Sequence, residues 1–135
     1  MPYLVDSDWV IDHLANVPAA NALLEDLTDD GIAVSIITYM EAYQGLLRTP
    51  AGHVEAESRF NALVEGVPVI SVSIAVARRC AHLRESLRQQ EKRVSSRALD
   101  LLIAATALEY DLTLVTRNLD DYRDIPDLRL YTSPE

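Results

Sequence analysis

The chain has 135 residues, which suits one domain, and its 49% hydrophobic and 24% charged residues are typical of a globular protein. A net charge of −9 argues against a uniformly basic nucleic-acid-binding surface, and the single cysteine, Cys80, excludes an internal disulfide. The chain shows neither a signal-peptide pattern nor an apolar run of about 20 residues. We therefore expect one cytoplasmic domain over residues 1–135 that does not contact a membrane.

The first half of the chain alternates apolar runs with helical patterns. Its predicted elements are a strand at 3–5, helices at 9–14 and 19–27, a strand at 32–37 and a helix from 38 to about 47. The first strand stops at Asp6, a carboxylate directly before a helical pattern. Thr38 and Glu41 have the spacing of a capping box, which predicts that the last of these helices begins at Thr38.

The second half continues the alternation after a helix-breaking segment at 49–52. Its predicted elements are a helix at 53–65 with Phe60, Leu63 and Val64 inward, a strand at 67–72, a helix at 74–91 capped by Ser73, a helix at 98–108, a strand at 112–116, a helical turn at 117–122 and an edge strand at 128–131. The 98–108 helix is apolar nearly all round and should be buried. The 74–91 helix should bury one stripe and turn its arginines outward, the stripe being Ala77, Cys80, Ala81, Leu83 and Leu87.

Strands that alternate with helices in this way predict a parallel sheet with right-handed crossovers. The fold class is therefore α/β, a single domain in which helices flank a parallel sheet of four to five strands on both faces. In such sheets, ligands bind outside the carboxyl ends of the strands. Asp6 lies at such an end.

Three other acidic residues occupy comparable places. Glu41 lies early in the helix after the second strand, Asp100 opens the apolar helix, and Asp121 follows the fourth strand together with Asn118. Carboxylates gathered at one sheet edge repel one another unless a cation neutralises them. Oxygen ligands suit Mg²⁺ or Mn²⁺, which can activate water for attack on a phosphodiester. The placement predicts a metal-dependent hydrolytic site.

Each of these residues also has a purely structural interpretation. Asp6 could cap the next helix, Glu41 could complete the capping box, and Asn118 with Asp121 could cap the turn after the fourth strand. Asp100 is harder to explain this way, because a carboxylate among leucines is costly to bury without a partner.

Seven of the twelve basic residues lie between positions 78 and 97, where only Glu85 and Glu91 oppose them, so this segment carries +5 and the remainder −14. A basic segment on an acidic body can hold a phosphate backbone. From charge alone, a solvated helix face is the more probable interpretation, and a dimer-facing surface is a further one. The candidate contacts with a phosphate backbone are Arg84, Arg88, Lys92, Arg93 and Arg97.

Four motifs, taken together, resemble one known family. They are LVDSD at 4–8, SIITYME at 35–41, ALDLLIAATA at 98–107 and LVTRNLDDY at 114–122. In this order and spacing they resemble the PIN domain, and most closely the VapC ribonuclease toxins of type II toxin–antitoxin systems. The resemblance covers essentially the whole chain. Asp8 stands where the family often has Asn, and Tyr122 replaces the more common Phe.

The resemblance implies a Mg²⁺- or Mn²⁺-dependent endoribonuclease that cleaves structured RNA, such as tRNA or rRNA. It implies a cognate VapB-type antitoxin as partner and a homodimer. By position, Asp6 and Asp100 become metal ligands and Glu41 a ligand or the residue that positions water. The fourth site residue could be Asn118, Asp120 or Asp121. Asp121 is the candidate for a catalytic role, and Asn118 or Asp121 could be a further metal ligand. Ser7, Thr116 and Asn118 should support the site.

Two other functions fit parts of the sequence. Asp6 and Asp8 have the Asp-x-Asp spacing of a haloacid-dehalogenase-like phosphatase, in which they would act as nucleophile and acid/base. Lys92, the only lysine, is misplaced for that mechanism. The second alternative is a PIN-like module that binds partners without catalysis, although all three core carboxylates are present.

Overall fold

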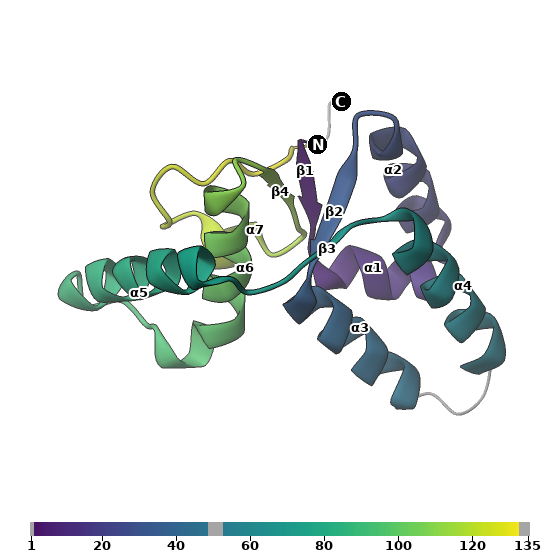
Figure 1. Cartoon of the computed structure of the whole chain (residues 1–135), viewed down its shortest axis with the longest axis horizontal. Helices are drawn as coiled ribbons and strands as arrows, with labels where there is room; N and C mark the ends of the chain where they lie inside the picture. The colour runs from purple at the N-terminus through teal and green to yellow at the C-terminus, as the bar shows by residue number, and fades with distance from the viewer. Residues whose placement is uncertain (1, 49–52, 133–135) are drawn as a thin grey trace.

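A parallel four-stranded sheet lies at the centre of the structure, a computed structural model that describes residues 2–48 and 53–132 (Figure 1). The strand order is β3-β2-β1-β4, and β1 pairs in parallel with both β2 and β4. The elements are β1 (Tyr3–Val5), α1 (Ser7–Leu14), α2 (Pro18–Thr28), β2 (Ile32–Ser35), α3 (Ile36–Leu47), α4 (His53–Gly66), β3 (Val69–Ile70), α5 (Ile74–Gln89), the 3₁₀ helix η1 (Ser95–Arg97), α6 (Ala98–Glu109), β4 (Thr113–Val115) and α7 (Leu119–Tyr122). The predicted fold class is confirmed, and the helix break expected at 49–52 lies outside the described residues.

Two apolar cores cover the two faces of the sheet because successive strand residues point to opposite sides. One core joins Leu4, Ala33 and Leu114 to the buried faces of α5 and α6. The other joins Val5, Val34 and Val115 to side chains of α1 to α4. In Figure 1, α5, α6 and α7 lie on one side of the strands, and α1, α2 and α4 lie on the other. The result is the predicted arrangement of helices around a central sheet.

The helix after β2 begins earlier than predicted. Ser35 ends β2, and its side chain accepts a hydrogen bond from the Thr38 backbone N–H at 3.0 Å. Ser35 is therefore the N-cap, and the predicted strand ends two residues short of Ile37. The Thr38–Glu41 capping box was wrong: Thr38 lies in the first turn and Glu41 in the second. Glu41 is thus left without a role at the helix terminus.

The other differences concern short edge elements. The predicted strand at 67–72 contains only two paired residues, with Pro68, which lacks an N–H, directly before them. The edge strand expected at 128–131 was wrong. This segment forms one isolated parallel bridge between Leu114 and Leu130. A single bridge is too short to add a fifth strand.

The buried stripe of α5 is narrower than predicted. Cys80, Leu83 and Leu87 are buried together with Val76, whereas Ala77 and Ala81 are exposed. The buried residues follow the helical spacing i, i+4, i+7 and i+11, and they pack against α6, which is buried as expected. The arginines Arg78, Arg79 and Arg88 are exposed.

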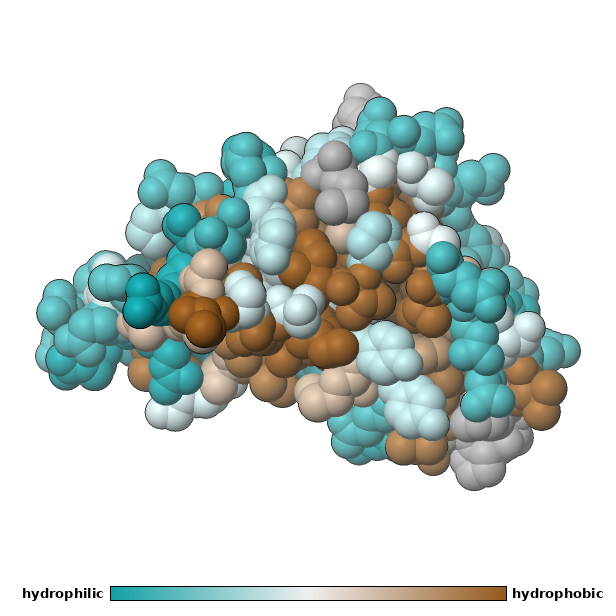
Figure 2. Space-filling view, viewed as in Figure 1, coloured by the Kyte–Doolittle hydropathy of each residue, from teal (hydrophilic) through white to brown (hydrophobic). Residues whose placement is uncertain are grey.

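The surface combines charged margins with a more apolar middle. In Figure 2, apolar side chains gather across the centre of the visible face, and hydrophilic ones surround them. Large exposed apolar side chains include Ile36 and Met40 on α3, Ile74 on α5 and Leu99 on α6. Within residues 2–48 and 53–132, every helix is too short or too polar to cross a membrane.

Candidate active site

The carboxyl ends of β1 and β4 bring the first two site residues together. Asp6 directly follows β1, and its backbone N–H donates to the Val115 carbonyl at 2.9 Å, which ties it to the last residue of β4. Asp6 is 3% exposed. Asp6 is also the N-cap of α1, with Oδ1 accepting from the Ser7 N–H at 2.8 Å. The capping interpretation is therefore correct, and it leaves Oδ2 available for other partners.

Thr116 connects the first acidic segment to the end of β4. Its hydroxyl lies 2.8 Å from Asp6 Oδ2 and 3.3 Å from Asp8 Oδ2. Asp8 also accepts backbone hydrogen bonds from Trp9 at 2.7 Å and from Arg117 at 2.8 Å. These hydrogen bonds to Thr116 and Arg117 anchor the loop after β4 to Asp8. The charge of Asp8 also adds to the negative charge of the site.

Tyr122 links the two carboxylates that the sequence placed at the centre of the site. Its ring is buried, and its hydroxyl lies 3.4 Å from Asp6 Oδ2 and 3.2 Å from Asp100 Oδ1. Burial and the two carboxylates raise the pKa of Tyr122 far above its ordinary value, so the phenol stays protonated. A single phenolic proton thus lies between Asp6 and Asp100. The sequence shows Tyr in place of the more common Phe at this position, but it does not show which groups the hydroxyl contacts.

The electrostatics of the site are those of crowded carboxylates. Burial, aided by the charges of Asp8 and Asp100, raises the pKa of Asp6 to about 6, although hydrogen bonds from Thr116 and Ser7 oppose the shift. Burial also raises the pKa of Asp100, with Asp121 adding to the shift and the Tyr122 hydrogen bond opposing it. A cation near these groups would relieve this cost.

Glu41 approaches the same cluster from α3. Burial raises the pKa of Glu41, the Ser7 side-chain hydrogen bond lowers it, and the charges of Asp100 and Asp8 raise it. Glu41 therefore lies near enough to Asp100 and Asp8 for their charges to act on it, and its carboxylate accepts a hydrogen bond from the Ser7 side chain. Because Ser35 caps α3, the capping explanation for Glu41 no longer applies.

The segment around α7 separates the three candidates for the fourth place. Asp121 lies near enough to Asp100 to raise the pKa of that carboxyl by charge repulsion. Asp120 is 89% exposed and pairs with Arg123 at 2.7 Å. Asn118 forms no side-chain cap on α7, and its backbone N–H donates to Thr116 Oγ1 at 3.1 Å. The geometry favours Asp121 over Asp120 and gives Asn118 a supporting contact.

The donor set fits a hard divalent cation. Asp6 and Asp100 offer oxygen ligands, and burial, the largest cause of the raised pKa values of both, makes their ionised forms costly without a cation. Within the described part of the chain, no three Asp, Glu, His or Cys side chains form a ready cage. Mg²⁺ characteristically uses one or two carboxylates and keeps several waters, so a partial set of protein ligands is what this ion requires.

The basic residues fall into two groups. Arg84 is half-buried and Arg93 is exposed, so both side chains reach the surface. Arg88 is exposed but pairs with Glu85 at 2.6 Å. Arg97 differs from the expectation: its side chain is 8% exposed and bonds to Asp124, which also lies 3.7 Å from Lys92. A buried, paired guanidinium is poorly placed to contact RNA, so we remove Arg97 from the candidate RNA-binding residues.

The substitution Tyr122→Phe tests the bridging hydroxyl. We expect it to lower the free energy of unfolding of the metal-free protein by about 1–2 kcal/mol, because Asp100 loses a hydrogen bond to a charged group while the ring remains packed. Chemical denaturation at neutral pH measures the change. Tyr110→Phe, at an exposed position on the same side of the sheet, is the control. Equal stability of Tyr122→Phe and wild type would contradict the bridge.

Comparison with known proteins agrees with this geometry. The sequence profile of the PIN domain matches residues 3–128. Ribonuclease VapC19 of Mycobacterium tuberculosis is 32% identical over 128 residues, which are 93% of this chain and 96% of that protein. Ribonuclease VapC1 of Haemophilus influenzae is 25% identical over 131 residues, 96% of each chain.

Solved structures show the same fold. One is the structure of VapBC2 from Rickettsia felis bound to a DNA fragment from its promoter. A chain of that structure matches this one with a TM-score of 0.84 and 24% identity, over 99% of this chain and 100% of that chain. A toxin–antitoxin complex from Klebsiella pneumoniae contains a chain with 28% identity and a TM-score of 0.72, covering 93% of this chain and 94% of that one. The chain therefore belongs to the PIN-domain family, within its VapC ribonuclease group.

Proposed function

We propose that the protein is an endoribonuclease toxin whose activity requires a divalent cation, Mg²⁺ or Mn²⁺, held by Asp6 and Asp100. The observation that carries the proposal is the convergence of these two carboxylates on Tyr122, with Glu41 and Asp121 contributing negative charge nearby. Its VapC relatives are named ribonucleases, which supports RNA as the substrate. The proposed substrate class is structured RNA, such as tRNA or rRNA.

Each residue has a distinct part in this proposal. When bound, the cation supplies positive charge to the carboxylates and the phosphodiester and favours ionisation of water. Asp6 and Asp100 hold it, with Asn118 or Asp121 as further candidate ligands. Glu41 orients the attacking water and accepts its proton, a task that suits a carboxylate with a raised pKa. Thr116 and Ser7 hold Asp6 in place through hydrogen bonds.

The test is cleavage of tRNA and rRNA by the purified protein with Mg²⁺, with Mn²⁺ and with excess chelator. We expect cleavage only with a divalent cation. Turnover of a phosphomonoester without RNA cleavage would favour the phosphatase alternative. The contacts of Asp8 argue against that alternative, because backbone N–H groups occupy the side chain that would act as acid/base. Failure to cleave any RNA with any metal would favour the non-catalytic module.

The basic segment remains a proposed RNA-binding surface, now formed by Arg84, Arg88, Lys92 and Arg93. We expect Arg93→Glu to weaken RNA binding and to reduce the slope of log affinity against log salt by about 1, as loss of one phosphate contact should. Arg48→Glu, an equal charge change at an exposed residue outside this segment, is the control. Binding measured at several salt concentrations decides the matter, and identical slopes for Arg93→Glu and wild type would contradict this surface.

The proposed partner is a VapB-type antitoxin, supported by the toxin–antitoxin complexes among the similar structures. Coexpression of the protein with the product of the neighbouring reading frame should give a stable complex in which RNA cleavage is suppressed. The homodimer and the cytoplasmic location are further parts of the proposal. The family resemblance supports the homodimer, and the proposed RNA substrate supports the cytoplasmic location.

A further inference from the structure

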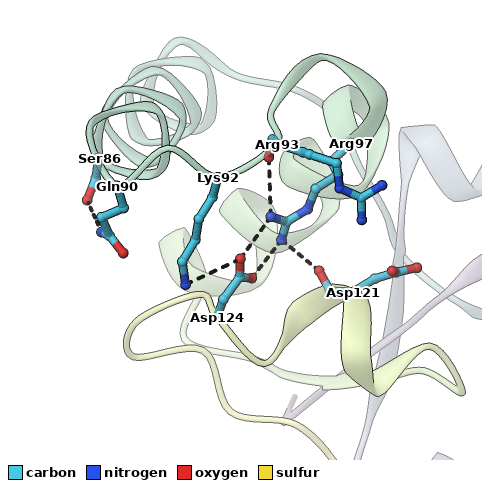
Figure 3. Close-up of polar contacts among 7 residues, drawn as sticks. All are labelled: Ser86, Gln90, Lys92, Arg93, Arg97, Asp121 and Asp124. Carbon is cyan, nitrogen blue, oxygen red and sulfur yellow. Dashed lines mark hydrogen bonds and ion pairs between the residues drawn. The ribbon is translucent and has the colours of Figure 1, made fainter.

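Arg97 connects the start of α6, which carries Asp100, to α7, which carries Asp121. It ends η1 and is the N-cap residue of α6, three residues before Asp100. Its guanidinium points away from solvent and towards the segment that follows α7 (Figure 3). Two nitrogens donate to the Asp124 carboxylate, at 2.9 and 2.7 Å. The pair is bidentate, the geometry that fixes orientation as well as distance.

The same guanidinium holds the backbone of Asp121. One of its nitrogens donates to the Asp121 carbonyl at 2.7 Å and the other to the Arg93 carbonyl at 3.3 Å. Figure 3 shows these bonds converging on Arg97 from the turn before α6 and from the end of α7. Lys92 adds a second, weaker contact to Asp124 at 3.7 Å. We call Arg97, Asp124 and the Asp121 carbonyl the Arg97 clamp.

Stability alone explains the Arg97 clamp poorly. Burying the Arg97 guanidinium and partly burying the Asp124 carboxylate, whose side chain is 25% exposed, costs solvation that their attraction often does no more than repay. Arg97 Nε is moreover buried without a hydrogen-bond partner among the described residues, which adds to the cost. Ion pairs of this kind are retained in some proteins for the geometry that they specify.

The geometry in question is that of the carboxylate site. The bonded carbonyl belongs to Asp121, and the next residue, Tyr122, reaches Asp100 and Asp6 with its hydroxyl. Asp100 lies one helical turn after Arg97. The Arg97 clamp therefore links the residue before α6 to the backbone of α7. It does so next to the place where Tyr122 of α7 contacts Asp100 of α6.

We propose that Arg97 and Asp124 are positioning residues, which fix Asp121 and Tyr122 against Asp100 and so prepare the carboxylate site for a divalent cation. This inference rests on the proposed function. It also accounts for the burial of Arg97 inside a basic segment whose other basic side chains reach the surface. Outer contacts of this kind are commonly worth a factor of 10–100 in metal affinity.

The experiment measures Mn²⁺ binding to the full-length, metal-free protein by the electron paramagnetic resonance signal of free Mn²⁺. We expect Arg97→Gln and Arg97→Lys to weaken Mn²⁺ binding by about tenfold or more, since Lys keeps the charge but cannot form the bidentate contact. The Mg²⁺ concentration for half-maximal RNA cleavage should rise by a similar factor, while the rate at saturating Mg²⁺ approaches that of wild type.

Two controls separate positioning from general destabilisation. Leu83→Ala creates a cavity in α5, and it should lower the melting temperature without changing Mn²⁺ affinity. Arg79→Gln breaks the exposed Arg79–Glu109 pair between α5 and α6, and it should change neither property appreciably. Asp124→Asn provides a second test of the clamp if the Arg97 variants do not fold, and the same loss of Mn²⁺ affinity is expected.

The outcomes distinguish the two proposals. Wild-type protein that binds no Mn²⁺ would overturn the metal-dependent function and the positioning role with it. Wild-type binding combined with unchanged affinity in the folded clamp variants would overturn only the positioning role. An equal loss of affinity in Leu83→Ala would also overturn it, because destabilisation alone would then explain the effect.

Discussion

The substitution Asp6→Asn is expected to reduce metal-dependent RNA cleavage at least about 100-fold, more than the loss of an outer contact to a metal site usually costs. Asp6 is the carboxylate at the end of β1 that shares the Tyr122 hydroxyl with Asp100. Removing its charge leaves one central carboxylate to hold the cation. Initial rates of RNA cleavage over a range of Mg²⁺ concentrations measure the effect.

Asn can retain the local hydrogen bonds, so this loss should occur in a folded protein. Its amide oxygen can accept from Ser7, as Asp6 Oδ1 does, and its NH₂ can donate to the Thr116 hydroxyl, which then donates to Asp8. Asp120→Asn is the matched control on α7, because Asp120 is exposed and paired with Arg123, and it should cleave normally. Undiminished cleavage by Asp6→Asn would refute the assignment of Asp6.

The second large effect is a fall in the stability of the metal-free protein as the pH rises from about 4 to 7. The pKa of Asp6 is about 6 in the folded protein, against an ordinary value of 3.8. Below pH 3.8 the carboxyl is protonated in both states and its contribution to stability is complete. As the pH rises through 6, the folded protein must ionise a buried group that the unfolded chain ionises freely, and the contribution is lost.

The shift corresponds to about 3 kcal/mol, since one pKa unit is worth about 1.4 kcal/mol. Raised pKa values at Glu41 and Asp100 act in the same direction, whereas the lowered pKa of Asp124 acts oppositely. The difference in unfolding free energy between Asp6→Asn and wild type isolates Asp6. It should increase by about 2.4 kcal/mol in favour of the variant between pH 4 and 7, because part of the full effect is already lost at pH 4.

Chemical denaturation in the presence of chelator measures this difference at each pH. Added Mg²⁺ at pH 7 should raise the stability of wild type and have little effect on Asp6→Asn, because binding to the folded state stabilises it. A stability difference between the two proteins that does not vary with pH would show that burial does not perturb Asp6 in the metal-free protein.

The sequence alone determined the class of fold and the central residues proposed for the site. Apolar runs of strand length alternate with helical patterns, and that period is a local property of the chain. The carboxyl end of the first strand therefore located Asp6, and the apolar context of Asp100 marked a carboxylate that needed a partner. Local patterns were less reliable at boundaries: Ser35 and Thr38 are both competent caps, and only the packed helix shows that Ser35 caps it.

Tertiary structure decided which polar groups meet. Tyr122 could have been a core aromatic, but the crossing of α7 over α6 places its hydroxyl between Asp6 and Asp100. Arg97 lies in a basic segment of the sequence that predicted an RNA-binding surface. In the structure its guanidinium is buried and donates to Asp124, 27 positions later. Such contacts join residues distant in sequence, and no local period encodes them. The pattern of apolar residues fixes which elements form, whereas the pairing of buried polar groups depends on how those elements pack.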